Sequence, residues 1–240
     1  MPELDLADLD SRMRQAIKEF WQALGKAKGA SADQSNERAA VLSGGHLNSV
    51  AKLISDLVVA SGLPSESVKV GDRVDLPGYF RATKKWDLLI VHEGKLLAAI
   101  ELKSMGSSFG NNLNNRAEEV LGLSLDFFHA HKHDLFGSVE PPFLGYCVIV
   151  VDDPIIHRPV STKASHFAVL PEFQDRGYAE RWVILCKKMI QERIYNAAAV
   201  ILTNKDDGLS DGRHHSLDEV TSFRHFIRAL MAHLSVATGS

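Results

Sequence analysis

Residues 84–104 read KKWDLLIVHEGKLLAAIELKS, and their pattern sets the expected architecture of the chain. Two apolar runs flank a short His-Glu-Gly-Lys turn, so the stretch is predicted to form a β-hairpin. Asp87 begins the first strand, whereas Glu101 and Lys103 end the second. The start of one antiparallel strand lies beside the end of the next, so the three side chains are expected to converge. Glu101 and Lys103 are two residues apart and therefore point to the same face of the sheet.

This group of two carboxylates and one ammonium suits metal-dependent phosphodiester hydrolysis. Mg²⁺ prefers carboxylate oxygens together with waters and a substrate phosphate. The expected metal ligands are Asp87, Glu101 and the Leu102 backbone carbonyl, which lies between Glu101 and Lys103. The metal would polarise the phosphoryl group, and Lys103 would orient the attacking water, stabilise the developing charge, or both. The expected catalytic residues are therefore Asp87, Glu101 and Lys103.

A plain surface hairpin with ion pairs at one end is the alternative interpretation, because such pairs are common and contribute little to stability. Residues 96–100 are all apolar, however, which is typical of an inner strand of a sheet. Charged groups at the end of an inner strand are costly to bury for packing alone. The context therefore favours the catalytic interpretation.

The same residues carry a resemblance to a known family. Asp87, followed after residues 88–100 by Glu101-Leu102-Lys103, resembles the signature of the PD-(D/E)xK nucleases, with Trp86 where that signature often has proline. Residues 106–119, GSSFGNNLNNRAEE, look like the segment that follows in the XhoI-type Type II restriction endonucleases. The resemblance spans most of the chain and implies a Mg²⁺-dependent homodimer that cuts double-stranded DNA at the palindrome CTCGAG. It also implies a cognate DNA methyltransferase in the same system, without direct contact between the two proteins.

Length and composition set bounds on function without deciding it. At 240 residues, 45% hydrophobic and 24% charged, the chain has the composition of an ordinary globular protein. It has no apolar run of about 18 residues and no signal peptide pattern, so neither a membrane span nor export is expected. Cys147 and Cys186 fit neither a zinc motif nor a disulfide framework and favour a reducing cytoplasm, which would be bacterial if the family resemblance holds. The net charge of −3 does not exclude DNA binding, since a local basic cleft is sufficient.

The order of predicted elements favours an α/β fold in which helices flank a mixed β-sheet, the core that the PD-(D/E)xK resemblance also implies. Besides the hairpin, we predict helices over 5–25, 45–61, 114–131, 178–194 and 216–236, and strands over 68–76, 144–151 and 197–203. We expect a single nuclease domain over 1–240, with a helical part (1–62), a sheet core with the catalytic hairpin (63–205) and a C-terminal loop and helix (206–240). The first and last helices are candidates for the dimer interface, although each could instead cover the sheet.

Polar side chains just after the hairpin are the expected DNA contacts, namely Asn111, Asn112, Asn114, Asn115 and Arg116. Asn can pair with adenine edges, and Arg can pair with guanine or phosphate. The alternative for the asparagines is a structural role in a polar turn and a helix cap. Arg158 and Lys163, in a polar loop, are further candidates, because loops on a rigid scaffold often carry recognition. Either Glu118 or Glu119 could orient a water or hold a second metal, with Glu118 the named candidate, or the pair could form an acidic first helical turn.

Other interpretations stay open. His129 and His133 are four residues apart, a spacing that can bind zinc, but no third ligand is placed beside them, so a solvent-facing helix end is favoured. The chain could be a PD-(D/E)xK nuclease of DNA repair or recombination, which would be expected to carry a helicase or an extra binding domain. It could also be a catalytically silent DNA-binding module, although such modules usually lack the acid or the lysine of the triad, and all three triad residues are present here.

Overall fold

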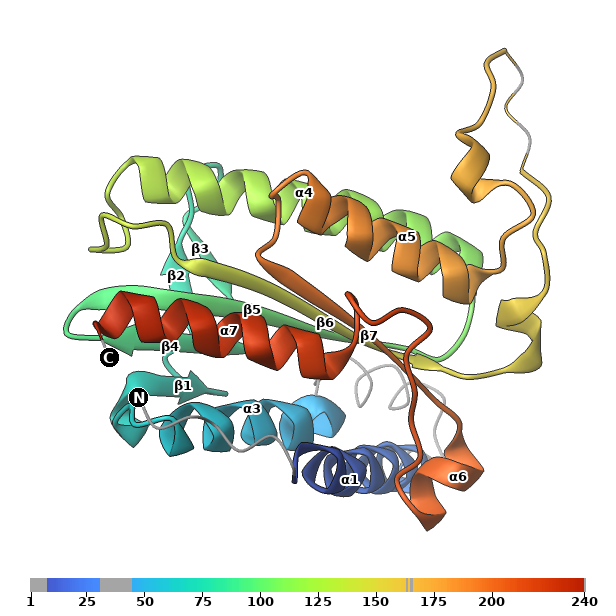
Figure 1. The fold of residues 1–240 in the computed structure, drawn as a ribbon, viewed down its shortest axis with the longest axis horizontal. Coiled ribbons are helices and arrows are strands. Elements are labelled where there is room, and N and C mark those ends of the chain that lie inside the picture. Colours follow the sequence, from blue (N-terminus) through green and yellow to red (C-terminus); the bar gives the residue numbers. More distant parts are fainter. Residues whose placement is uncertain (1–7, 31–44, 163, 165, 240) are drawn as a thin grey trace.

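A computed structural model describes residues 8–30, 45–162, 164 and 166–239 of the protein. Its centre is a five-stranded sheet in the order β1-β4-β5-β6-β7 (Figure 1). The strands are β1 (Val68–Val70), β4 (Leu88–His92), β5 (Lys95–Met105), β6 (Phe143–Val151) and β7 (Ala197–Thr203). β1, β4 and β5 pair antiparallel, whereas β5, β6 and β7 pair parallel. The predicted mixed sheet is therefore confirmed.

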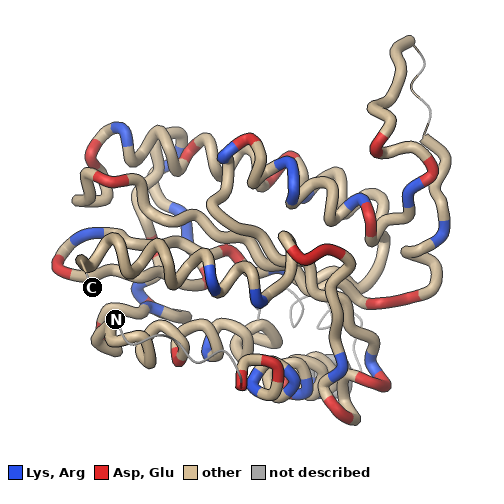
Figure 2. Tube along the Cα trace, viewed as in Figure 1, with Lys and Arg blue, Asp and Glu red and all other residues tan. Residues whose placement is uncertain are grey.

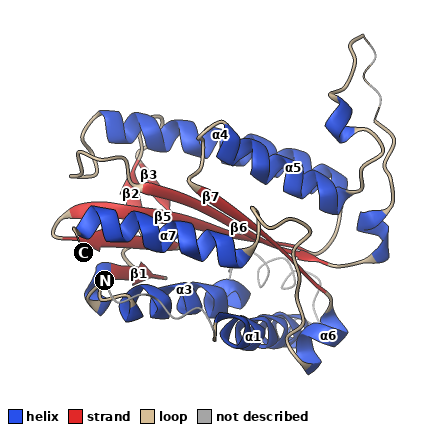
Figure 3. Cartoon of the chain, viewed as in Figure 1, coloured by secondary structure: helices blue, strands red, loops and turns tan. Residues whose placement is uncertain are grey.

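Helices cover both faces of this sheet (Figure 3). α4 (Phe109–Lys132) and α5 (Tyr178–Gln191) pack on one face, and α1 (Leu9–Ala30), α3 (Asn48–Ala60) and α7 (Phe223–Thr238) pack on the other. A separate two-stranded sheet of β2 (Asp75–Pro77) and β3 (Thr83–Lys85) precedes β4. The shorter elements are η1 (Gly45–Leu47), η2 (Ser65–Ser67), η3 (Pro154–His157), η4 (Pro171–Phe173) and α6 (Lys205–Ser210). No described helix has both the length and the apolar content needed to span a membrane.

Alternate residues of β5 enter two different cores. Ile100 and Leu102 pack beneath α1, α3 and α7, whereas Ala99 packs beneath α4 and α5. Because strand side chains alternate between the two faces, Glu101 and Lys103 lie on the face that α4 and α5 cover. Figure 2 shows that charged residues are more frequent on the helices and connecting loops than on the long strands between them. An acid and a lysine on an inner strand therefore stand out against an otherwise apolar sheet.

The predicted hairpin is present. Leu88 of β4 lies opposite Ile100 of β5, and a tight turn at Glu93 and Gly94 joins the two strands. Both turn residues have positive φ, which is typical of a type I′ turn and matches the twist of a two-stranded hairpin. β5 continues to Met105, beyond the last residue that pairs with β4. The far end of β5 is thus open on the β4 side.

The strand predicted over 68–76 is wrong in part, because the chain turns in its middle. Only Val68–Val70 pairs with β4. Gly71 and Arg73 have positive φ, which an extended strand does not permit, and the chain becomes extended again at Asp75 as β2. The alternating sequence is thus divided between two sheets. The short β2–β3 hairpin that results was not predicted.

Two helices extend further than predicted. α4 begins at Phe109, so the asparagine-rich segment is helical and is not a loop. Asn is a weaker helix former than Ala or Leu, but Leu113 is buried beneath this turn and its packing outweighs that preference. α1 continues to Ala30, beyond the end of the helix predicted over 5–25. Residues 31–44 lie outside the described part of the chain.

The last helix begins later than predicted. Ser222 caps α7 by accepting the His225 N–H at 3.1 Å. Residues 216–221 instead follow the edge of β7, where the Val200 N–H donates to the Thr221 carbonyl at 2.9 Å. These residues therefore satisfy backbone groups of an edge strand, which explains why they are not helical.

The apolar faces of α1 and α7 are buried within the chain. In α1, Leu9, Met13, Ile17 and Phe20 are at most 2% exposed, and in α7 the buried residues include Phe226, Ile227, Leu230 and Leu234, each at 0%. All of these side chains belong to the core beneath one face of the sheet. Of the two roles considered for these helices, covering the sheet is the one that the structure shows.

Both cysteines are free thiols buried in the core, Cys147 on β6 and Cys186 on α5. Burial raises the pKa of Cys147 to about 12 and also raises the pKa of Cys186. Because the thiolate is the reactive form, both should resist thiol reagents at about pH 8 in the native protein and react after unfolding. Titration with dithionitrobenzoate before and after adding guanidinium chloride measures this. Rapid modification of the native protein would contradict the buried placement.

Candidate active site

A cleft of about 650 Å³ opens between the end of β5, the β2–β3 hairpin and α4. Asp87, Glu101 and Lys103 all line it, so the structure brings together the three side chains that were expected to converge. The other lining residues come from the β2–β3 hairpin, from its link to β4 and from α4, and they are Arg81, Lys84, Lys85, Trp86, Glu118, Glu119, Gly122 and Leu123. Carboxylates and basic groups therefore face one another across this space.

Asp87 ends the pairing between β4 and β5 with its side chain. Leu88 is the first residue of β4 to pair with β5, opposite Ile100. One residue earlier, Asp87 Oδ2 accepts the Leu102 N–H at 2.7 Å. Burial raises the pKa of Asp87, and the neighbouring Glu101 carboxylate raises it further. The two carboxylates are thus close enough to repel each other, and a bound cation would relieve that repulsion.

Glu101 is the most buried acid of the cleft, with 4% of its surface exposed. Each of its two oxygens meets an ammonium group. Oε1 pairs with Lys103 Nζ, and Oε2 accepts from Lys84 Nζ at 2.9 Å. A carboxylate this buried needs such partners, because leaving a buried charge unpaired is strongly destabilising.

Lys103 connects the sheet to α4. Its ammonium pairs with Glu101 and lies 3.5 Å from Glu119 Oε1. Burial alone would lower the pKa of Lys103, but the Glu101 carboxylate outweighs that effect and the net shift is upward. Glu119 Oε2 in turn pairs with the Arg116 guanidinium. Arg116, predicted as a DNA contact, therefore belongs to the charge network around Lys103 in this structure.

The oxygen donors in the cleft fit Mg²⁺. Asp87 and Glu101 offer carboxylates, and Leu102 beside them offers a backbone carbonyl. Mg²⁺ is commonly held by one or two carboxylates and otherwise by waters and a substrate phosphate, so two acids are sufficient. In the described ranges of the chain, no group of three or more His, Cys, Asp or Glu side chains is arranged to hold a metal. The residues present therefore suit a site that the substrate would complete.

The asparagines predicted to contact DNA lie in the first turns of α4. Asn111, Asn114 and Asn115 are exposed. Asn112 instead donates its side-chain N–H to the Ser107 carbonyl at 2.6 Å, which agrees with the alternative of a polar turn for this residue. None of the four lines the cleft. Any contact they make with DNA would therefore lie beside the cleft and outside it.

The start of α4 and the loop after β6 lie at the same edge of the sheet. β5, β6 and β7 run parallel, so the segments that follow them emerge at that edge (Figure 1). The rings of Phe109 and Tyr178, at the starts of α4 and α5, lie 6.4 Å apart. Arg158 is exposed in the loop after β6, and the other basic candidate of that loop, Lys163, lies outside the described residues. Arg158 and the exposed asparagines thus belong to one edge of the molecule.

Of the remaining candidates, Glu118 lines the cleft, whereas His129 and His133 do not. Glu118 is exposed and lines the cleft, while its neighbour Glu119 makes the contact with Lys103. His129 and His133 face Tyr79, with ring centroids 5.1 Å and 4.6 Å from the Tyr79 ring. In the part of the chain that the structure describes, the two histidines belong to no metal-binding group.

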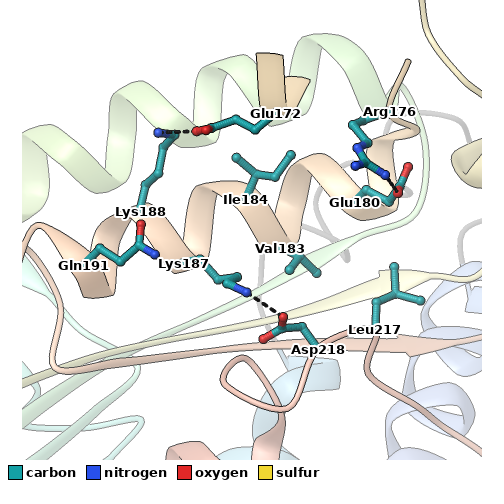
Figure 4. Close-up of a pocket in the computed structure, with 10 residues that line it drawn as sticks. All are labelled: Glu172, Arg176, Glu180, Val183, Ile184, Lys187, Lys188, Gln191, Leu217 and Asp218. Atoms are coloured by element: carbon teal, nitrogen blue, oxygen red, sulfur yellow. Dashed lines mark hydrogen bonds and ion pairs between the residues drawn. The ribbon is translucent and has the colours of Figure 1, made fainter. Parts of the chain in front are cut away.

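A second pocket of about 560 Å³ lies on the outer face of α5 (Figure 4). Its charged side chains pair with one another. Lys187 Nζ lies 2.7 Å from Asp218 Oδ2, and Arg176 Nη1 lies 2.7 Å from Glu180 Oε1. These are partly exposed ion pairs of the kind that contribute little to stability. The pocket thus differs from the cleft, where the buried Glu101 carboxylate lies beside the partly buried Asp87 carboxylate.

Helices on both faces of a mixed sheet, with a cleft of carboxylates and lysines at the end of its inner hairpin, place the protein among the restriction-endonuclease-like nucleases. Comparison with known families narrows this class. The family model described as "Restriction endonuclease XhoI" matches residues 25–215, and the chain therefore belongs to the XhoI restriction endonuclease family.

Three curated relatives carry the name of Type II restriction enzymes, which are site-specific deoxyribonucleases. BstVI from Geobacillus stearothermophilus is 37% identical over 214 residues, covering 87% of this chain and 95% of that protein. XhoI from Xanthomonas vasicola is 39% identical over 192 residues, covering 78% and 77%. AbrI from Azospirillum brasilense is 34% identical over 171 residues, covering 68% and 76%. No solved structure matches the chain.

Sequence reasoning missed Lys84 as a partner of Glu101 and did not single out Glu119 from its neighbour Glu118. Lys84 reaches Glu101 only because the β2–β3 hairpin folds back toward the sheet, and that hairpin was not predicted. Glu118 and Glu119 could not be distinguished until the face of α4 that meets the sheet was known. The available signals were a pair of lysines before Trp86 and a pair of acids on the helix, and neither signal identifies which member faces the site.

Replacing Arg116 with Ala should slow DNA cleavage by about 10-fold, because partners that orient an active-site group commonly contribute this much. DNA binding should change little, since Arg116 pairs with Glu119 beside Lys103. Single-turnover cleavage measures the effect on rate, and a binding titration measures the effect on affinity. The comparison is Asn114→Ala, at an exposed position of α4 that is predicted to contact DNA, where the loss of binding should be the main effect. An equal loss of binding and cleavage rate in Arg116→Ala would show instead that Arg116 contacts DNA directly.

Proposed function

We propose that this protein hydrolyses double-stranded DNA with Mg²⁺ as its cofactor, with Asp87, Glu101 and the Leu102 carbonyl as metal ligands and Lys103 acting in the chemical step. The observation that carries the proposal is the pair of neighbouring carboxylates, the buried Glu101 and the partly buried Asp87, next to Lys103 in one cleft. Membership of a restriction endonuclease family supports DNA as the substrate. A phosphodiester is also the substrate that this combination of oxygen ligands and ammonium suits.

The position of each side chain suggests its part in the reaction. A bound Mg²⁺ would polarise the phosphoryl group of the scissile bond. Asp87 is held in place by the Leu102 N–H, so its carboxylate stays fixed at the start of β4. Lys103 is a donor that can orient the attacking water or stabilise charge on the phosphoryl oxygens. Glu119, 3.5 Å from the Lys103 ammonium, restricts where that ammonium can go.

The recognition sequence that we propose is the palindrome CTCGAG, which the resemblance to the XhoI-type enzymes implies. The identity to named Type II restriction enzymes over most of the chain supports a site-specific activity. Exposed polar residues at one edge of the sheet are the proposed DNA contacts, namely Asn111, Asn114, Asn115 and Arg158. A cognate methyltransferase and a cytoplasmic location stay predictions.

The two rival functions have less support. A nuclease of repair or recombination would share the cleft, but the three curated relatives are all named as Type II restriction enzymes. A catalytically silent DNA-binding module would not need a buried and a partly buried carboxylate side by side, which cost stability. Asp87, Glu101 and Lys103 are all present and all line one cleft.

We propose that the working form is a homodimer. Each chain contributes one set of Asp87, Glu101 and Lys103, whereas cutting both strands of a palindrome in one encounter calls for two sets related by a twofold axis. The outer face of α4 retains two exposed leucines, Leu121 at 45% and Leu125 at 54%. This face is the proposed contact between protomers, because exposed apolar side chains on one helix face favour association.

Replacing Lys103 with Ala should reduce cleavage by at least about 100-fold, because it removes a group that acts in the transition state. Specific DNA binding should persist, since the groove contacts lie elsewhere. Plasmid digestion with Mg²⁺, sequencing of the ends, and a binding titration with Ca²⁺ in place of Mg²⁺ measure both quantities. If a folded Lys103→Ala protein cuts DNA within about tenfold of the wild-type rate, the assignment of Lys103 to the active site is wrong.

Sedimentation with a duplex that carries CTCGAG is expected to show two protomers of 26.4 kDa per duplex. Leu125→Asp should lower this to one, because it places a charge in an apolar contact. Val236→Asp is the matched control, since Val236 is 84% exposed on α7. One wild-type protomer per duplex, with nicking of a single strand, would contradict the homodimer.

A further inference from the structure

Glu101 has two lysine partners, and the catalytic signature accounts for only one of them. Lys103 is part of the signature on β5, whereas Lys84 comes from β3, in the separate two-stranded sheet. Lys84 Nζ lies 2.9 Å from Glu101 Oε2, and the Lys84 side chain is only 17% exposed. The β2–β3 hairpin thus delivers a second ammonium to the most buried acid of the cleft.

The position of Lys84 is well defined by its surroundings. Its ammonium lies 4.9 Å from the centre of the Trp86 ring, and it also donates to the Lys85 carbonyl at 2.5 Å. Trp86 is itself buried, and its backbone N–H donates to the Val74 carbonyl at 2.9 Å. This bond joins the residue after β3 to the residue before β2. A lysine held in this way points into the cleft instead of moving freely on the surface.

Asp126 of α4 holds the tip of the same hairpin. Its side chain is 7% exposed and forms an ion pair with Arg81 Nε at 2.9 Å. Its Oδ1 also accepts the N–H groups of Tyr79 and Phe80, at 2.9 Å and 2.7 Å. Gly78 leaves room for this carboxylate, because a Cβ there would lie 2.8 Å from Asp126 Oδ2. One nearly buried acid therefore fixes three consecutive residues of the tip.

Packing alone does not account for this arrangement. A buried ion pair is often no more stable than apolar residues of similar size, so a structural role would not require Lys84. Lys84 instead faces a cleft that already holds Lys103 and the two carboxylates proposed as metal ligands. A scissile phosphate that enters this cleft is an anion within reach of the Lys84 ammonium, and a positioned ammonium stabilises charge that develops on phosphoryl oxygens.

We propose that Lys84 is a second catalytic lysine that contacts the scissile phosphate, and that Asp126 is a positioning residue that holds the β2–β3 hairpin and Lys84 over the cleft. This inference rests on the nuclease function proposed for the same cleft. It adds a residue that lies outside the Asp87–Glu101–Lys103 set and on a different sheet. It also gives the small hairpin a function, which is to close one side of the active site.

The first test compares Lys84→Met with Lys52→Met, a control on an exposed lysine of α3 at the opposite face of the sheet. Met keeps the length of the side chain and its contact with Trp86 but removes the charge. Lys84→Met should cleave a duplex that carries the mapped wild-type site about 100-fold more slowly in single turnover, with binding in Ca²⁺ changed by less than about threefold. Lys52→Met should match the wild type in both measurements.

Two results would overturn the assignment of Lys84. One is cleavage by folded Lys84→Met within about threefold of the wild-type rate, and the other is a loss of binding as large as the loss of rate. Should Lys84→Met fail to fold, Lys84→Arg keeps the ion pair and is expected to cleave about 10-fold more slowly, because the two cations differ in shape and donor geometry. A wild-type rate for Lys84→Arg in that case overturns the assignment. Cleavage by Lys103→Ala at the wild-type rate is a different result, because it contradicts the active-site assignment on which this inference rests. No cleavage of the duplex by the wild-type protein with Mg²⁺ would contradict the proposed function itself.

The role of Asp126 is tested by a double-mutant cycle. Asp126→Asn should slow cleavage by about 10-fold, and the Asp126→Asn, Lys84→Met double variant should be no slower than Lys84→Met alone, because Asp126 acts through Lys84. Thermal melts of all three variants check that they are folded at the assay temperature. Rate losses that multiply in the double variant would show that Asp126 acts independently of Lys84 and would overturn its assignment.

Discussion

The hydrogen bond from the Leu102 N–H to the Asp87 carboxylate fixes the geometry on which the active site depends. It forms just before β4 begins, where β5 continues past its pairing with β4, so a side chain takes the place of the next backbone pairing. Beyond this point β5 still pairs with β6, which keeps Glu101 and Lys103 on a rigid strand. The side of β5 that β4 leaves open is the side on which the cleft lies. A site built on paired strands holds its groups more precisely than a site on loops.

The same geometry costs stability. Asp87 and Glu101 are partly or fully buried and repel each other, and two lysines only partly offset that repulsion. Removing one member of a buried ion pair typically destabilises a protein by about 3–5 kcal/mol, whereas apolar replacements of the whole group are often neutral or stabilising. A sheet selected for stability alone would therefore carry apolar residues here. The charges agree with the proposal that a cation and a phosphate bind between them.

The parts of the fold that depend on local pattern could be predicted from sequence. The hairpin was predictable because two apolar runs and a turn with a glycine at positive φ determine it within a short stretch. The helical state of the asparagine-rich segment was not, because it depends on Leu113 packing against the sheet. The place of Lys84 in the cleft was not predictable either. It requires the β2–β3 hairpin to dock on Asp126, which is distant in sequence and carries no motif.

Iron-directed backbone cleavage tests the central claim, that the end of this hairpin binds the divalent metal. Fe²⁺ takes the same oxygen ligands as Mg²⁺ and, with ascorbate and peroxide, cuts the polypeptide where it is bound. The account predicts cuts at residues 87 and 101–103 that excess Mg²⁺ suppresses and that Asp87→Asn abolishes. Cuts confined to other parts of the chain, or cuts that Mg²⁺ does not suppress, would contradict it.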